Sequence, residues 1–173
     1  FIDDIKSFVK PDLDNDERVK IDRFIEAFHS FTDANQNYIV HKFIGRPILD
    51  IEDSIKKTKE FLKNTPLQGL VLGFNLFNSI KEDLISVRKI LSYTSYQYRL
   101  LANNLSDVLL DCGIVYFNTI IKNTEVQLSE GNQILELINI ANTIALDGNA
   151  RKRVDENKVF FEDRKSTRLN SSH

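Results

Sequence analysis

Apolar residues recur at intervals of seven through the middle of the chain, between positions 70 and 115. One series consists of Leu70, Phe77, Leu84, Leu91, Tyr98, Leu105 and Cys112. A second series, three residues later, consists of Ile80, Val87, Leu101, Val108 and Val115. A seven-residue period keeps one stripe of a helix turned toward one neighbouring helix. The pattern therefore predicts long helices that pack nearly parallel or antiparallel to one another.

Hydroxyl-bearing residues in this region indicate where its helices end. Thr65 and Pro66 have the character of an N-cap and a first helical residue. The stretch SYTSY at residues 92–96 favours a break, and Ser79 with Glu82 forms a capping-box pattern. The helices expected are 66–77, 80–91 and 95–121, with one helix over 66–121 as the alternative.

Shorter apolar stripes, divided by prolines, occupy the first 66 residues. Helical spacing predicts a helix over residues 2–9 and another over residues 14–31. The second helix either continues to residue 44 or is followed by a short one. Gly45 and Pro47 then stand in the order typical of a helix end, so a new helix is expected over residues 48–62.

The C-terminal part again shows helical spacing, with one apolar face made of Ile134, Leu137, Ile138, Ala141 and Ala145. Asp147-Gly148-Asn149 combines a glycine stop with an asparagine N-cap, so a last helix is expected from Ala150 to about Glu162. No segment has the period-two alternation of a strand. The predicted fold class is all-α: an antiparallel bundle of long helices or an array of helical hairpins, formed by residues 1–162 as a single domain.

Composition and charge narrow the classes of function. Hydrophobic residues make up 42% of the chain and charged residues 28%, which are ordinary values for a folded domain. The net charge of −2 lacks the basic excess of nucleic-acid-binding surfaces, and no apolar run approaches the roughly 18 residues that span a membrane. Cys112 is the only cysteine, which excludes an intrachain disulfide. We therefore expect a cytoplasmic protein without a cofactor that binds neither nucleic acid nor membranes.

The final residues, DRKSTRLNSSH, differ in character from the rest of the chain. They resemble, without a mismatch, the in-frame translation of a widely used short-read sequencing adapter. Residues 163–173 are therefore expected to be a non-native polar tail that is disordered. Three of the 23 basic residues and one of the 25 acidic residues lie in this tail, so residues 1–162 carry a net charge of −4. Since the chain also lacks methionine, we interpret it as a fragment of a longer protein.

Only one spacing resembles a set of metal ligands. Glu26 and His29 lie three positions apart, which places both on one helix face, as in the Glu-x-x-His pairs of di-iron carboxylate bundles. Asp33 is one turn further on, but no second Glu-x-x-His pair completes the set. A helical metalloenzyme that uses Glu26 and His29 is kept as an alternative, and no metal site is assigned.

The basic cluster Arg151-Lys152-Arg153 begins the last expected helix, where the helix dipole disfavours cations. These three residues are candidates for binding an acidic partner surface. The preferred interpretation is local neutralisation, with Asp155 and Glu156 four residues after Arg151 and Lys152.

Two features that involve small residues predict packing rather than chemistry. Cys112 occupies a seam position, and buried cysteine usually acts as a small apolar side chain. Gly69 and Gly73 form a G-x-x-x-G pattern, which predicts a close approach of two helices.

Residues 105–162 resemble a degenerate tetratricopeptide hairpin. In LLDCGIVYFN, Gly113 and Tyr116 match the Gly-x-x-Tyr spacing of the first helix of this family, with Leu109 four residues before the glycine. In INIANTIALDG, Ala141 and Ala145 resemble the small residues of its second helix. The resemblance implies a helical array that binds other proteins.

These patterns together predict a non-catalytic module for protein–protein interaction or scaffolding within a larger, multidomain protein. Its partner would be another protein or an upstream domain of the same chain. The alternative is a coiled-coil-like homo-oligomer in which the apolar seam over residues 70–115 forms the subunit interface.

Overall fold

The computed structural model describes residues 33–91, 95–123 and 127–169, with side-chain environments for residues 44–88, 91, 95–122 and 127–162. The helices expected over residues 2–9 and 14–31 lie outside this part of the chain. Every regular element within it is helical, which confirms the predicted all-α class.

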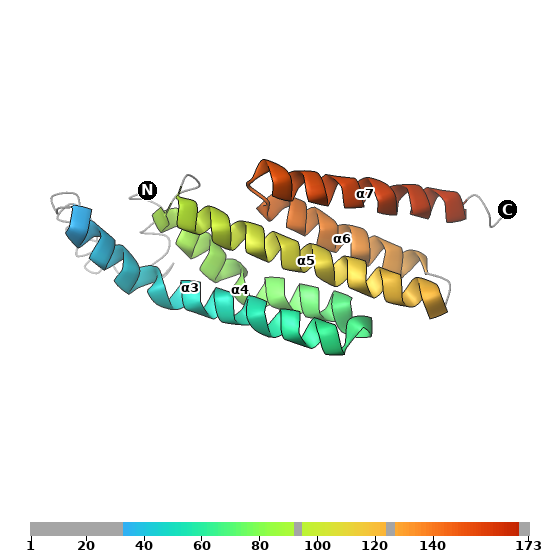
Figure 1. Ribbon diagram of the computed structural model, residues 1–173, viewed down its shortest axis with the longest axis horizontal. Coiled ribbons are helices and arrows are strands. Elements are labelled where there is room, and N and C mark those ends of the chain that lie inside the picture. The colour runs from blue at the N-terminus through green and yellow to red at the C-terminus, as the bar shows by residue number, and fades with distance from the viewer. Residues whose placement is uncertain (1–32, 92–94, 124–126, 170–173) are drawn as a thin grey trace, which may run out of the picture.

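Five α-helices and one 3-10 turn follow one another along the described chain (Figure 1). They are α3 (Asp33–Asn64), η1 (Pro66–Gln68), α4 (Gly69–Leu91), α5 (Tyr96–Asn123), α6 (Leu128–Ile144) and α7 (Gly148–Leu169). Because the connections are short, each helix runs antiparallel to the one before it. In the resulting up-and-down bundle α5 has a central place and contacts α3, α4, α6 and α7.

α3 is continuous through Gly45 and Pro47, so the helix end predicted at these residues is wrong. A proline inside a helix removes one hydrogen bond and costs about 3 kcal/mol. Ile44 and Ile48, on either side of Pro47, are 0% and 5% exposed. Burying an isoleucine contributes about 1.5–3 kcal/mol. The packing of one apolar stripe across the proline therefore outweighs its local cost.

α4 passes through the break that was predicted between residues 77 and 80, so that prediction is also wrong. The Ser79 hydroxyl does not cap a new helix but donates to the carbonyl oxygen of Leu76 in the same helix at 2.8 Å. Leu76 and Ile80 are both buried, so the core continues across the expected break. The described residues between 66 and 121 thus form a 3-10 turn and two long helices, α4 ending at Leu91 and α5 beginning at Tyr96, rather than one helix.

Two predicted helix starts are close to the observed ones, but the residues that were predicted to cap them do not do so. Pro66 begins η1, yet the Thr65 hydroxyl donates to the Phe61 carbonyl oxygen at the end of α3 (2.8 Å) instead of capping η1. α7 begins at Gly148, so Asn149 lies inside the helix and is not its N-cap.

α7 extends to Leu169, beyond the end expected near Glu162. The backbone of residues 163–169 is therefore helical, whereas disorder was expected for this tail. The side chains of these residues, and all of residues 170–173, lie outside the description. That residues 163–173 are non-native stays a prediction.

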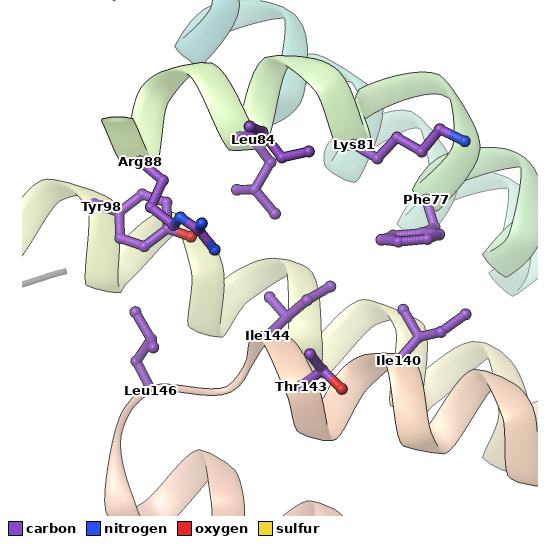
Figure 2. Close-up of a pocket in the computed structure, with 10 residues that line it drawn as sticks. Phe77, Lys81, Leu84, Arg88, Tyr98, Ile140, Thr143, Ile144 and Leu146 are labelled. Carbon is purple, nitrogen blue, oxygen red and sulfur yellow. The ribbon is translucent and has the colours of Figure 1, made fainter. Parts of the chain in front are cut away.

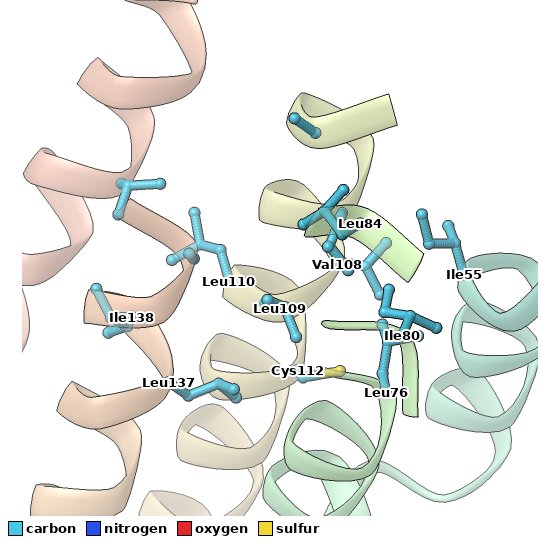
Figure 3. Close-up of a cluster of buried hydrophobic side chains, with 14 of the residues drawn as sticks. Ile55, Leu76, Ile80, Leu84, Val108, Leu109, Leu110, Cys112, Leu137 and Ile138 are labelled. Carbon is cyan, nitrogen blue, oxygen red and sulfur yellow. The ribbon is translucent and has the colours of Figure 1, made fainter. Parts of the chain in front are cut away.

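The seven-residue seam is buried inside the single chain. Nine of its twelve members are at most 7% exposed, and Phe77, Leu91 and Val115 are partly buried against the same core. The nine are Leu70, Ile80, Leu84, Val87, Tyr98, Leu101, Leu105, Val108 and Cys112. Figure 3 shows four of them, Ile80 and Leu84 of α4 and Val108 and Cys112 of α5, in one cluster with Ile55 of α3 and Leu137 of α6. The side chains that were predicted to form a subunit interface are therefore packed against helices of the same chain.

Gly69 and Gly73 confirm the predicted close approach of helices. A Cβ atom on Gly69 would lie 2.4 Å from the carbonyl oxygen of Cys112 in α5. A Cβ atom on Gly73 would lie 2.6 Å from Cδ2 of Leu137 in α6. Both distances are shorter than Cβ contacts tolerate. At Gly69 the obstacle is backbone, so the start of α4 contacts α5 this closely only with glycine there, whereas at Gly73 the nearest obstacle is the flexible end of the Leu137 side chain.

Candidate functional site

A groove opens between α4 and α6 beyond their contact at Gly73. At that glycine α4 lies against Leu137 of α6, whereas further along α4 a cavity of about 370 Å³ lies between the two helices. The first turn of α5 contributes to the floor of this cavity (Figure 2). Three helices that are distant in sequence therefore build one site, here called the α4–α6 groove.

Most of the residues that line the α4–α6 groove are apolar. They are Phe77, Lys81, Leu84, Ile85 and Arg88 of α4, Tyr98 of α5, Ile140, Thr143 and Ile144 of α6, and Leu146 just after α6. Leu84 and Tyr98 belong to the buried core, so the floor is held by the packing of the bundle. Ile85 at the rim is 39% exposed. The groove thus presents apolar surface to solvent beside a packed floor.

Both charged side chains of the groove are cations. Lys81 and Arg88 are exposed on α4, and seven residues of helix separate them by about 10 Å. Figure 2 shows the Arg88 side chain pointing toward Tyr98. Among the described residues that line the groove none is acidic, although the whole chain carries a net charge of −2. The groove is therefore locally positive.

Asn103 of α5 holds the end of the groove in place. Its side-chain oxygen accepts hydrogen bonds from the backbone N–H groups of Leu146 (2.9 Å) and Asp147 (3.2 Å). Its side-chain nitrogen donates to the Asp147 carboxylate at 2.6 Å, and Arg99 binds the other oxygen of that carboxylate. Since half-buried N–H groups need acceptors, Asn103 fixes the path of the chain after α6 and the position of Leu146.

Ser106 orients α6 against α5. This fully buried serine donates its hydroxyl to the carbonyl oxygen of Ala141 at 2.8 Å. Ala141 is also fully buried, so this side of α6 faces α5. The neighbouring side chains of Ile140 and Ile144 then point into the α4–α6 groove (Figure 2).

Arg153 of the predicted basic cluster ties α7 to α5. Its guanidinium donates hydrogen bonds to the carboxylates of Asp107 and Asp111. Partial burial would by itself lower the pKa of Arg153, but the hydrogen bonds to these carboxylates raise it above its ordinary value. The two acids lie four positions apart on α5, so one guanidinium reaches both.

The other two residues of the basic cluster also have contacts within the chain. Lys152 Nζ lies 3.8 Å from Glu156 Oε1, which confirms that part of the predicted local neutralisation. Arg151 instead donates to the carbonyl oxygen of Ala145 at 3.0 Å, while Asp155 accepts a hydrogen bond from α6. None of the three lines the α4–α6 groove, and their role in binding a partner stays a prediction.

Glu26 and His29 lie outside the described residues, so the structure does not place them. Within the part of the chain that it does describe, no group of three or more His, Cys, Asp and Glu side chains could hold a metal ion. The metalloenzyme with Glu26 and His29 therefore stays an untested alternative hypothesis.

Cys112 is fully buried, in agreement with its predicted place in the core. Burial, with a smaller contribution from the charge of Asp111, raises the pKa of its thiol to about 12. The thiol is therefore protonated at neutral pH and is a poor nucleophile in the folded state.

A second cavity of about 420 Å³ lies between α3 and α5. Its lining consists of Glu52, Ile55, Lys56, Lys59, Glu60, Lys63, Leu101 and Asn104. Acidic and basic side chains are mixed along α3 here, as on a solvated helix face. Since the α4–α6 groove is more apolar and carries charge of one sign, it is the stronger candidate site.

The central helix α5 is the one helix of the described chain that passes a test of length and composition for a membrane span. Within its segment Tyr96–Lys122, an 18-residue window has a mean hydropathy of 1.2, so the helix is long and apolar enough to cross a membrane by length and composition alone. However, 56% of this window is buried inside the bundle. A helix in the core of a bundle meets the same criteria, so this property follows from the place of α5 in the fold.

The α4–α6 groove was not predicted from the sequence. Phe77, Leu84 and Tyr98 belong to the predicted seam, but Ile140 and Ile144, which stand four positions apart on another face of α6, were not part of any predicted site. A signal for the groove was present in the sequence of α6. Its apolar residues cover two adjacent faces, and a helix that packs against a single neighbour needs only one apolar face.

Comparisons with known proteins do not assign the chain to a family. No protein-family model, no curated protein and no solved structure matches it. The functional interpretation therefore depends on the geometry and charge of the α4–α6 groove.

Proposed function

We propose that the chain is a non-catalytic helical module for protein–protein interaction that binds a helix of its partner in the α4–α6 groove. The observation that carries this proposal is the apolar cavity of about 370 Å³ between the two helices. An amphipathic helix that lays its apolar face into such a groove removes both apolar surfaces from water. Because Leu84 and Tyr98 belong to the core, the floor needs little rearrangement on binding.

The length of the groove supports a helical ligand. Phe77 and Arg88 mark its ends along α4, and helical rise places them about 16 Å apart. This distance corresponds to about three helical turns, which is the span of apolar anchors at positions i, i+4, i+7 and i+11.

The α5–α6 pair supports the finer proposal of a tetratricopeptide-like hairpin toward the C-terminus. A Cβ atom on Gly113 would be in ordinary contact with side chains of α6, and Ala141 and Ala145 are almost fully buried. The Tyr116 hydroxyl donates to Glu130 in the first turn of α6 at 2.7 Å. The likeness is partial, because α5 has 28 residues and is longer than the first helix of such a hairpin.

Site-specific photo-cross-linking tests the proposed function. A benzoylphenylalanine replaces Ile85 at the rim of the groove, and the matched control carries it at Leu49 of α3, which is 57% exposed and outside the groove. The purified chain is irradiated in an extract of its source cells, and cross-linked proteins are identified by mass spectrometry. We expect a specific partner from position 85 that is not obtained from position 49.

A groove-filling variant makes this test specific. Thr143 is exposed on the α6 side of the groove, so Thr143→Trp fills the site without replacing a core residue. We expect Thr143→Trp to abolish the cross-link from position 85 while the thermal unfolding midpoint stays close to that of the unmodified chain. The same cross-links at both positions, or cross-links that persist in Thr143→Trp, would contradict the proposed function.

A further inference from the structure

The charge of the α4–α6 groove defines the kind of helix that fits it. Building on the proposed function, we infer that the partner segment is an acidic amphipathic helix, whose apolar face enters the groove and whose carboxylates face Lys81 and Arg88. Both cations are exposed in the lining, and none of the described lining residues is acidic. A carboxylate that approaches this rim is attracted to these cations, and no acid among the described lining residues repels it.

The two walls of the groove differ in charge. The α4 wall carries Lys81 and Arg88, whereas the α6 wall consists of Ile140, Thr143 and Ile144 and is neutral. The acidic residues of the ligand are therefore concentrated along one flank. Because the two cations are about 10 Å apart, acids seven positions apart on a helix parallel or antiparallel to α4 would reach both.

This attraction is local, since the whole chain has a net charge of −2 and repels an acidic partner at a distance. At physiological ionic strength charges are screened over about 8 Å, so a docked helix responds mainly to the cations beside it. Salt should therefore weaken the binding of an acidic helix, although the net charges of chain and ligand have the same sign.

A second copy of this chain is a less suitable occupant. In a two-fold dimer that buries both α4–α6 grooves against each other, Lys81 and Arg88 of one copy would approach the same cations of its partner. Like charges at such an interface repel one another, whereas the carboxylates of an acidic helix are attracted to these cations.

Peptide binding tests this inference directly. Three fluorescein-labelled peptides of about 16 residues share leucines at i, i+4, i+7 and i+11 and are designed to be helical. The first carries glutamates beside the leucines, the second carries lysines there, and the third is a scrambled form of the first. Fluorescence anisotropy with the full chain is expected to show the acidic peptide binding at least about tenfold more tightly than the basic one. This preference should decrease on addition of about 0.5 M NaCl.

Charge-reversal variants assign the preference to the groove. Lys81→Glu combined with Arg88→Glu is expected to reverse it, so that the basic peptide binds more tightly. The matched control combines Lys56→Glu with Lys59→Glu on α3, which changes the net charge equally but outside the groove. The control is expected to keep the preference for the acidic peptide, and Thr143→Trp should remove the binding of both peptides.

The outcomes separate this inference from the proposed function. Equal binding of acidic and basic peptides that Thr143→Trp abolishes would overturn the acidic preference and leave the groove as a helix-binding site. A partner cross-linked at position 85, together with no binding of the acidic peptide, would also overturn the acidic preference and leave the groove as a binding site. Cross-links from position 85 to a second copy or to residues 1–32 of the chain would also overturn the inference. If no peptide binds and position 85 gives no specific cross-link, both proposals fail.

Discussion

The backbone of Gly69 lies directly against the carbonyl group of Cys112, at a distance that leaves no space for a side chain. A Cβ atom at residue 69 would be 2.4 Å from that oxygen and 2.9 Å from Cβ of Tyr116. Neither atom is the flexible end of a side chain, so relief requires the two helices to move apart. The contact between the start of α4 and the middle of α5 therefore depends on this glycine.

Replacing Gly69 with alanine should lower the free energy of unfolding. Alanine gains about 1 kcal/mol of helix propensity, but overpacking typically costs about 1–3 kcal/mol and here involves backbone. We expect a net loss of about 1–2 kcal/mol, measured by urea denaturation. The control is Gly131→Ala in α6, where nothing lies within 4 Å of the new Cβ, and it should gain about 0.5–1 kcal/mol. A Gly69→Ala chain as stable as Gly131→Ala would contradict the close contact.

Removing the side chain of Asn103 should loosen the turn between α6 and α7. Asn103→Ala leaves the N–H groups of Leu146 and Asp147 without their acceptor, at an expected cost of about 1–3 kcal/mol. Hydrogen–deuterium exchange at these two amides should accelerate more than exchange in the middle of α5. The exposed neighbour Asn104 supplies the control, because Asn104→Ala should leave both amides protected. Unchanged exchange in Asn103→Ala would exclude the role assigned to this residue.

The buried thiol of Cys112 should make stability depend on pH above 9. Its pKa rises from 9.0 to about 12 on folding because burial disfavours the thiolate. Above pH 9 the unfolded chain therefore releases a proton that the folded chain keeps, and stability falls as pH rises. For this group the expected loss between pH 8 and pH 10 is about 1.4 kcal/mol.

Urea denaturation at several pH values measures this effect, with Cys112→Ala as the comparison. The alanine variant is less stable at every pH because it leaves a small cavity, but its stability should decline less steeply between pH 8 and pH 10. In the same pH range a thiol reagent should modify the native chain slowly, and the rate should increase with urea. Parallel pH profiles for the two chains would show that the thiol ionises equally in the folded and unfolded states.

The pairing of Arg153 with Asp107 and Asp111 should make a small contribution to stability. These side chains are 40–43% exposed, so solvent screening limits the expected loss in Arg153→Gln to about 0.5–1 kcal/mol. The loss should shrink in 1 M NaCl. Lys152→Gln, which removes a longer and more exposed pair, should change the free energy of unfolding by less. A double-mutant cycle between Arg153 and Asp107 with no coupling energy would remove this pair from the interactions that hold α7 to α5.

Local signals in the sequence predicted the helices better than they predicted the breaks between them. The break near residues 92–96 and the start of α5 were predicted, because residues 95–121 have a continuous apolar period and a hydroxyl-rich stretch before it. The helix breaks predicted at Pro47 and near Ser79 are absent from the structure, and both predictions failed for the same reason. Each local signal costs or gains a few kcal/mol at most, and buried residues on both sides, such as Ile44 and Ile48, outweigh it.

The candidate site depended on information that the sequence does not display. Lys81, Tyr98 and Ile144 become neighbours only when α4, α5 and α6 pack together (Figure 2). The partners of Arg153 are similarly remote, since Asp107 and Asp111 precede it by more than 40 residues. The sequence indicates only pairs within one helical turn, so Glu156 could be predicted as the partner of Lys152, but Asp107 and Asp111 could not be predicted as the partners of Arg153.

The sequence by itself determined that this chain is all-α and which stripe of its central helices is buried, because helical periodicity is a property of consecutive residues. It also predicted the close helix contact at Gly69 and Gly73 and the position of Cys112 in the core, where its thiol is unreactive. Only the tertiary structure decided that α3 and α4 are unbroken and that α4 and α6 leave a groove between them. The reason is that burial and the spacing of helices depend on all the segments that pack together, whereas caps, prolines and charge pairs act within a single turn.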